Sequence, residues 1–124
     1  MIFRTFKHIA ATVIATVFLV LRAHAQESAD GPKLFQQRCG ARHQVDSTRN
    51  GVGPYLQGVI GRTSGGVEGF RYSPAMKEAG IIWDAAQLDI FLTNPAGLVR
   101  GTRMTQRFAN ADERKAIIDL LATR

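Results

Sequence analysis

The sequence predicts a mainly α-helical fold with long loops. Residues that cap helices precede several short apolar stretches with helical spacing, and glycines interrupt the segment between positions 44 and 69. No stretch alternates apolar and polar residues as a half-buried strand would. The 124 residues are 45% hydrophobic and 21% charged. This ordinary globular balance favours one folded domain over a disordered or collagen-like chain.

Residues 1–25 are predicted to be a secretory signal peptide rather than part of the fold. Arg4 and Lys7 precede an apolar run at positions 9–21, and the small residues Ala23 and Ala25 follow it. An uncleaved membrane anchor is the alternative, but a run of 13 residues falls short of the roughly 20 needed to span a bilayer. We therefore expect cleavage after Ala25 and a periplasmic or otherwise exported protein.

The remaining domain, residues 26–124, needs a source of stability beyond its small core. A chain of this size buries only about 60 to 65% of the surface that the unfolded chain exposes. Small exported domains often gain stability from disulfides, but Cys39 is the only cysteine, so none can form within one chain. A prosthetic group and plain packing remain as alternatives. Loss of the signal peptide lowers the formal net charge from +6 to +3.

The first helix is predicted to follow Asp30, an N-cap residue, and to run toward Cys39, where Gly40 ends it. The segment 44–69 contains seven glycines and no sustained apolar period, which indicates loops and turns. Long loops in a small domain are typical of a chain that wraps around something.

Two further helices are predicted in the middle of the chain. Ser73 and Pro74 are typical of an N-cap and a first helical position, and Gly80 ends that short helix. Asp84 caps the next helix, which the Asn94-Pro95 pair closes. Residues 95–108 are expected to form another loop.

The last helix is predicted to start at Asn110. Glu113 follows three residues later, an arrangement typical of a capping box. The apolar residues of this segment recur at helical spacing and are expected to be buried: Ile117, Ile118, Leu120 and Leu121.

One short motif could carry chemistry. Cys39-Gly40-Ala41-Arg42-His43 differs at one position from C-x-x-C-H, the pattern by which two thioethers fix haem beside a histidine ligand. By itself this fragment is weak evidence for haem attachment, because a cysteine and a histidine four residues apart usually do not serve one site. His43 is, however, the only histidine in 26–124, and Met104 lies 61 residues downstream in a predicted loop. Together they could supply both axial ligands of a haem iron, whereas core packing is the alternative for Met104.

Short matches to one known family extend over almost all of residues 26–124. They comprise Gly31, Phe35, Cys39 and His43, and then positions 53–58, 61–63, 69–73, 80–83, 92–95 and 101–104. In these residues the sequence resembles the class I cytochromes c, particularly the mitochondrial-like bacterial ones. The resemblance implies an all-α small cytochrome c fold of about four to five helices, with long loops wrapped around one haem. It implies a one-electron carrier and not an enzyme.

The resemblance also implies roles for individual residues. His43 would be the proximal iron ligand, Met104 the distal ligand, and Cys39 the source of a thioether to haem c. The backbone carbonyl of Pro54 would accept a hydrogen bond from the His43 ring, and Thr102 would steady the methionine loop. Three more residues would hydrogen-bond or neutralise a haem propionate, although without the resemblance they look like ordinary surface, boundary and core residues: Arg62, Tyr72 and Trp83.

The sequence departs from the family pattern at three positions. Arg42 stands where the second thioether cysteine belongs, so at most one thioether can form. Haem held by one thioether, haem held without a covalent bond and a haem-deficient apoprotein all remain open. Phe91 occupies a position where the family commonly has tyrosine, and Arg100 replaces the usual proline before Gly101. A weakened Met104 bond would allow peroxidase-like activity as an alternative function.

The expected partners are redox proteins. Four arginines flank the two ligand segments and would suit docking to acidic surfaces, although solvated charge is the simpler interpretation: Arg42, Arg100, Arg103 and Arg107. A net charge of +3 without a nucleic-acid motif argues against nucleic-acid binding. We expect a monomer that is peripheral to membrane complexes.

Overall fold

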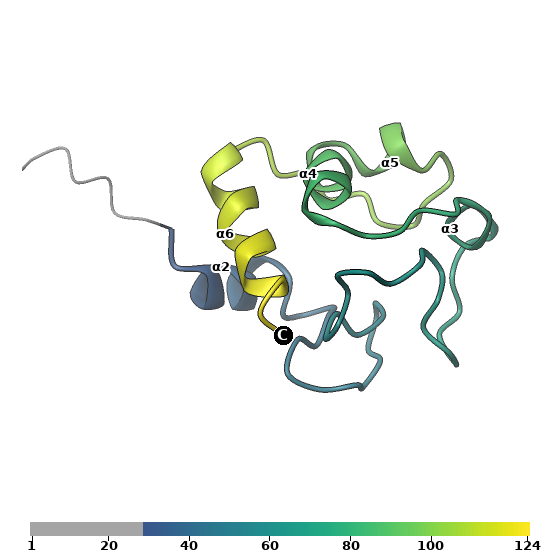
Figure 1. Ribbon diagram of the computed structural model, residues 1–124, viewed down its shortest axis with the longest axis horizontal. Helices are drawn as coiled ribbons and strands as arrows, with labels where there is room; N and C mark the ends of the chain where they lie inside the picture. Colours follow the sequence, from purple (N-terminus) through teal and green to yellow (C-terminus); the bar gives the residue numbers. More distant parts are fainter. Residues whose placement is uncertain (1–28) are drawn as a thin grey trace, which may run out of the picture.

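A computed structural model describes residues 29–124, so the predicted signal peptide lies outside the described residues. Within them the chain forms short helices joined by long loops (Figure 1). The helices are α2 (Gly31–Arg38), α3 (Pro74–Glu78), α4 (Ala85–Thr93), α5 (Pro95–Leu98) and α6 (Ala111–Leu121). The only strand-like pairing in the described part is an isolated bridge between Thr63 and Ile82. The predicted all-α fold of four to five helices with long loops is confirmed.

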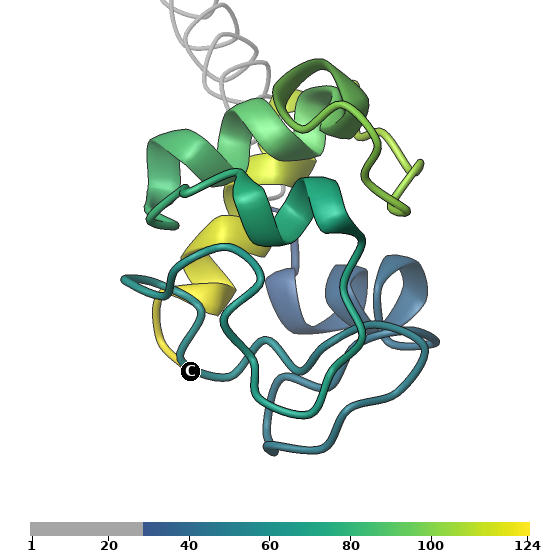
Figure 2. The same cartoon turned by 90° about the vertical axis from the view of Figure 1, so that its right-hand side faces the viewer.

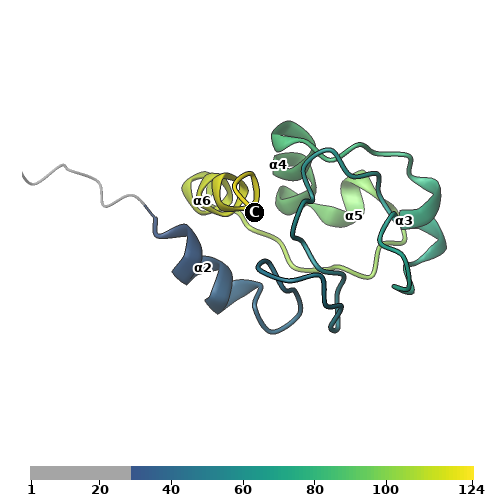
Figure 3. The same cartoon turned by 60° about the horizontal axis from the view of Figure 1, so that its bottom comes forward.

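The helices α2 and α6 lie side by side, and α4 contacts the other side of α6 (Figure 3). A glycine permits their close approach. A Cβ atom at Gly31 would stand 2.7 Å from the carbonyl oxygen of Ala116 and 3.5 Å from Leu120 Cβ. Gly31 therefore packs against the Ala116 and Leu120 positions of α6.

The predicted N-caps are present. The side chain of Asp30 accepts from the Lys33 amide at 3.2 Å, and that of Asp84 accepts from the Gln87 amide at 2.7 Å. Asn110 accepts from the Asp112 and Glu113 amides. The capping-box prediction is only half right, because the Glu113 carboxylate pairs with Arg38 of α2 at 3.3 Å. A cross-helix ion pair thus replaces the local return bond.

The prediction of an uninterrupted loop over 95–108 is wrong, because α5 occupies its beginning. The Asn94 side chain accepts from the Gly97 amide at 3.3 Å, and Pro95 takes the first helical position. A residue that ends one helix therefore also caps the next. The Asn94-Pro95 pair thus does more than close α4, which is all that the sequence pattern predicts.

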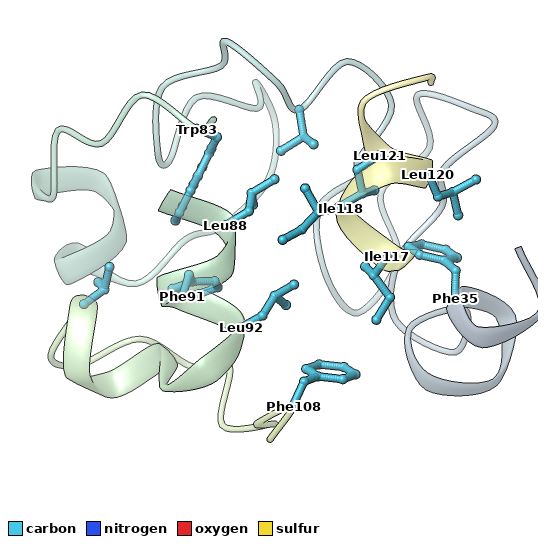
Figure 4. Close-up of a cluster of buried hydrophobic side chains, with 12 residues drawn as sticks. Phe35, Trp83, Leu88, Phe91, Leu92, Phe108, Ile117, Ile118, Leu120 and Leu121 are labelled. Carbon is cyan, nitrogen blue, oxygen red and sulfur yellow. The ribbon is translucent and has the colours of Figure 1, made fainter. Parts of the chain in front are cut away.

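The core is built from side chains of three helices and the loops between them (Figure 4). Buried residues of α4 face buried residues of α6, while Phe35 of α2 packs at the α6 side. The long loops between α2 and α3 form the side of the molecule that lies away from α4 and α5 (Figure 2). This leaves an apolar space bounded by helices on one side and loops on the other. None of the helices in 29–124 has the length and apolar character that a membrane crossing requires.

Candidate functional site

A cavity of about 410 Å³ lies between the helices and the loops. Its size is within the range of small-molecule and cofactor sites. Apolar side chains form much of its wall, including Phe35, Val59, Leu88, Phe91 and Leu92. The structure brings every residue predicted to touch a cofactor to this one cavity: Cys39, His43, Pro54, Arg62, Tyr72, Trp83, Thr102 and Met104. In particular, His43 and Met104 line the same cavity.

The His43 ring is held by its neighbours in a defined orientation. Its Nδ1 atom lies 2.8 Å from the Pro54 carbonyl oxygen. Because a carbonyl only accepts, Nδ1 carries the proton and Nε2 keeps a free lone pair. The adjacent backbone fits closely against the ring, since a Cβ at Gly53 would stand 2.7 Å from His43 Nδ1. Imidazole in this tautomer is suited to bind a metal through Nε2.

Burial lowers the pKa of His43 below its ordinary value of 6.5. The hydrogen bond to Pro54 acts in the opposite direction, and the nearby charge of Arg42 adds to the lowering. The ring is therefore neutral near pH 7, which is the form that a metal requires.

Met104 lies on the cavity wall in a loop that a glycine and a threonine shape. Gly101 has φ +95°, a conformation that other residues rarely adopt. The Met104 amide donates to Thr102 Oγ1 at 3.3 Å, and the Thr102 amide donates to the Val99 carbonyl at 3.1 Å. Thr102 thus fixes the backbone from which the thioether projects.

Cys39 is the C-cap residue of α2, and its amide donates to the Phe35 carbonyl at 2.7 Å. The predicted position of the motif at a helix end is confirmed. Burial raises the pKa of the Cys39 thiol to about 11, although the charge of Arg38 opposes the shift. The thiol is therefore protonated at neutral pH and half-buried at the cavity wall.

The three residues predicted to bind a haem propionate lie on the cavity wall, where each contacts other groups of the protein. The Arg62 guanidinium donates to the Tyr55 carbonyl at 2.8 Å and the Gln57 carbonyl at 2.5 Å. Tyr72 Oη accepts from the Val67 amide at 3.2 Å, and burial raises the Tyr72 pKa. Trp83 packs against the ring of Phe91 with centroids 5.1 Å apart. Their roles toward a propionate remain predictions.

The structure also places residues at the cavity that sequence reasoning did not assign to it. Met76 of α3 lines the wall and also packs against the core. Gln106 lines it too, and no sequence signal marks that residue. Of the four flanking arginines, Arg42 and Arg103 line the cavity, whereas Arg100 and Arg107 do not.

The donor set matches one kind of cofactor. A neutral imidazole nitrogen, a thioether sulfur and a thiol share one largely apolar cavity, which suits a flat apolar metal macrocycle with two axial positions and one covalent anchor. The residues present therefore fit haem. Arg42, at the cavity rim, provides no second anchor.

No protein-family model matches this sequence, but individual proteins match most of it. Cytochrome c 2.1 of Caenorhabditis elegans is 47% identical over 89 residues, which are 71% of this chain and 80% of that protein. Cytochrome c2 of Rhodomicrobium vannielii is 42% identical over 110 residues, covering 85% and 87% of the two chains. The solved structure of cytochrome cH from Methylobacterium extorquens matches with a TM-score of 0.71 and 37% identity, over 78% of this chain and 98% of that one. The chain belongs to the cytochrome c family.

Proposed function

We propose that residues 26–124 form a monohaem cytochrome c that carries one electron at a time between redox proteins. The observation that supports this function most directly is that His43 and Met104, 61 positions apart, line the same apolar cavity. When bound there, haem iron supplies the one-electron chemistry. Such a carrier is not an enzyme, because the chain's own residues bind and tune the group without reacting.

His43 would provide the proximal ligand and Met104 the distal one. Pro54 fixes the imidazole tautomer, and a carbonyl partner on Nδ1 raises the basicity of Nε2 toward iron. Thr102 holds the methionine backbone. A thioether ligand favours the reduced iron and so raises the potential. The apolar walls would exclude water around a haem bound there and so would reduce the solvent reorganisation that accompanies electron transfer.

Covalent attachment would rest on Cys39 alone. Its thiol lies at the cavity wall, where it could add to a haem vinyl group and form one thioether. A guanidinium cannot form that bond and remains charged, so Arg42 belongs at the exposed rim. Haem c with a single thioether is therefore the proposed cofactor state.

We place the carrier in the periplasm, delivered by the signal peptide at residues 1–25. Arg42 and Arg103 at the cavity rim would meet acidic surfaces of redox partners. Association of this kind is fast and becomes slower as salt is added. We expect a monomer that does not bind nucleic acid and visits membrane complexes only peripherally.

A pyridine haemochrome spectrum of the exported protein tests the proposal. One thioether gives an α band between that of two thioethers and that of free haem. The variant Cys39→Ala is the control, and its haem should become extractable by acidified organic solvent. Exported, folded protein that contains no haem would contradict the proposal.

A peroxide-dependent turnover assay separates the carrier from the peroxidase-like alternative. Iron with both axial ligands in place should give little turnover. Sustained turnover by the ferric protein would favour the alternative, in which Met104 leaves the iron readily.

A further inference from the structure

The backbone of Arg42 connects two parts of the proximal side of the cavity. Its amide donates to the Cys39 carbonyl at 3.0 Å, and its carbonyl accepts from the Gly53 amide at 2.8 Å. Residue 42 is therefore held between the segment that carries the thiol and the loop that packs against His43. The direction in which its side chain leaves is thereby constrained.

The side chain of Arg42 reaches across to the distal side. One terminal nitrogen, Nη1, donates to Gln106 Oε1 at 3.4 Å, over 64 positions of sequence. Gln106 lies two residues after Met104, and both Arg42 and Gln106 line the cavity. A single hydrogen bond thus joins the segment of one axial ligand to the segment of the other.

A neighbouring arginine acts on the same stretch of chain. The Arg38 guanidinium lies 4.9 Å from the centre of the Phe108 ring and pairs with Glu113 at 3.3 Å. Arg42 therefore contacts Gln106, and Arg38 contacts Phe108. Both contacted residues belong to the segment that leads into α6. The contact between Arg38 and Phe108 helps to hold that segment in place, so that Gln106 stays within reach of Arg42.

We propose that Arg42 is a positioning residue that fastens the Met104 loop to the His43 segment by holding Gln106. This inference rests on the proposed function, because it assigns the bond a role in keeping Met104 on the iron. Arginine suits the position because its planar group donates several bonds and tolerates an exposed rim. Because the bond is long and exposed, its effect on ligand affinity should be a factor of about two to five.

The affinity of added imidazole for the ferric holoprotein tests the proposal, because imidazole must displace Met104. In Arg42→Ala and in Gln106→Ala we expect imidazole to bind about two- to five-fold more tightly. The double variant should bind it no more tightly than either single variant. Arg107→Ala is the matched control: it removes an equal charge from the same loop, and among residues 29–124 the Arg107 side chain makes no hydrogen bond.

Two further measurements separate the effect of the hydrogen bond from the effect of the positive charge of Arg42. Arg42→Lys keeps the charge but loses the planar group, so it should resemble Arg42→Ala more than the wild type. Amide hydrogen exchange should quicken at positions 102–106 in Arg42→Ala and not in Arg107→Ala. If Arg42→Ala fails to mature, Gln106→Ala with position 42 intact gives the same comparison.

The outcomes distinguish a failure of the role proposed for Arg42 from a failure of the proposed function. Equal imidazole affinities in Arg42→Ala, Arg107→Ala and wild type, with a normal haem spectrum, would overturn the fastening role and leave the proposed function standing. Additive effects of the two single variants would overturn it too, because independent residues add. A wild-type protein without any haem spectrum overturns the proposed function and, with it, this inference.

Discussion

The backbone at Gly53 lies so close to His43 that a Cβ atom there would stand 2.7 Å from Nδ1 and 3.0 Å from Nε2 of the ring. The φ of Gly53 is not in the left-handed region, so the backbone conformation itself does not require glycine. Glycine is required because any side chain would collide with the ring. The next residue, Pro54, supplies the carbonyl that orients the same ring at 2.8 Å. Two consecutive residues therefore determine where Nε2 points.

Gly53→Ala should reduce haem incorporation strongly. The added methyl group must displace the ring, which breaks the bond to Pro54 and turns Nε2 away from the cavity centre. Haem content per exported protein, measured by the haemochrome spectrum, checks this. Gly51→Ala is the control, since its added carbon would meet only the Arg42 carbonyl, at 3.3 Å. Normal haem content in Gly53→Ala would show that the ring can move without loss of ligation.

Gly31→Ala should destabilise the fold by roughly 1 to 3 kcal/mol, the usual cost of overpacking. The new methyl group would press on the Ala116 carbonyl at 2.7 Å and separate α2 from α6. Replacing glycine within a helix offsets at most about 1 kcal/mol of that cost, so we expect a net loss of stability. Denaturant unfolding of the holoprotein measures it, with Gln37→Ala, exposed on α2, as control. An unchanged midpoint would contradict the close packing.

Phe91→Tyr should raise the reduction potential by roughly 20 to 60 mV, which is the one-electron equivalent of one hydrogen bond. A phenol that donates to the Met104 sulfur would withdraw electron density from the iron and disfavour the ferric state. Paired redox titrations give the shift, and Phe91→Leu reports the effect of losing the ring alone. Equal midpoints for wild type and Phe91→Tyr would refute the contact.

Arg42→Cys should create a second thioether and move the haemochrome α band to the position of doubly attached haem. It should also increase the yield of holoprotein, because a covalent bond retains haem that would otherwise dissociate. Arg42→Ser, which cannot form a thioether, is the matched control. If the band stays where the wild type has it, residue 42 does not face a vinyl group.

Acid should weaken the fold of the haem-free protein through His43, whose Nε2 is then free to take a proton. Its folded-state pKa lies below 6.5, so its contribution to stability is present above about pH 6.5 and is lost as pH falls through the lowered value. Because His43 is the only histidine in 26–124, no other imidazole confuses the titration. The unfolding midpoint of the haem-free protein, followed from pH about 8 to about 5, checks this. In the holoprotein, where iron would occupy Nε2, this transition should be absent from that range. A transition centred above 6.5 would contradict it.

Local signals in the sequence determined the helices. Asp30, Ser73, Asp84 and Asn110 each satisfy amide groups that a helix start leaves unpaired, and such bonds join residues only two or three positions apart. The missed helix α5 and the half-correct capping box fail for different reasons. Asn94 caps α5 through a local bond to the Gly97 amide, so its double role as helix end and helix start was missed. Glu113 instead pairs with Arg38, 75 positions away, which only packing of α2 on α6 decides.

The sequence by itself determined which residues could hold an iron, because imidazole, thioether and thiol are rare in residues 26–124 and their chemistry is fixed by residue type. Only the tertiary structure decided that His43 and Met104 share one cavity and that Gly53 and Gln106 support them. Those contacts join positions up to 64 apart. Local propensity carries no information on such distances, which are set by how the loops close over the helices.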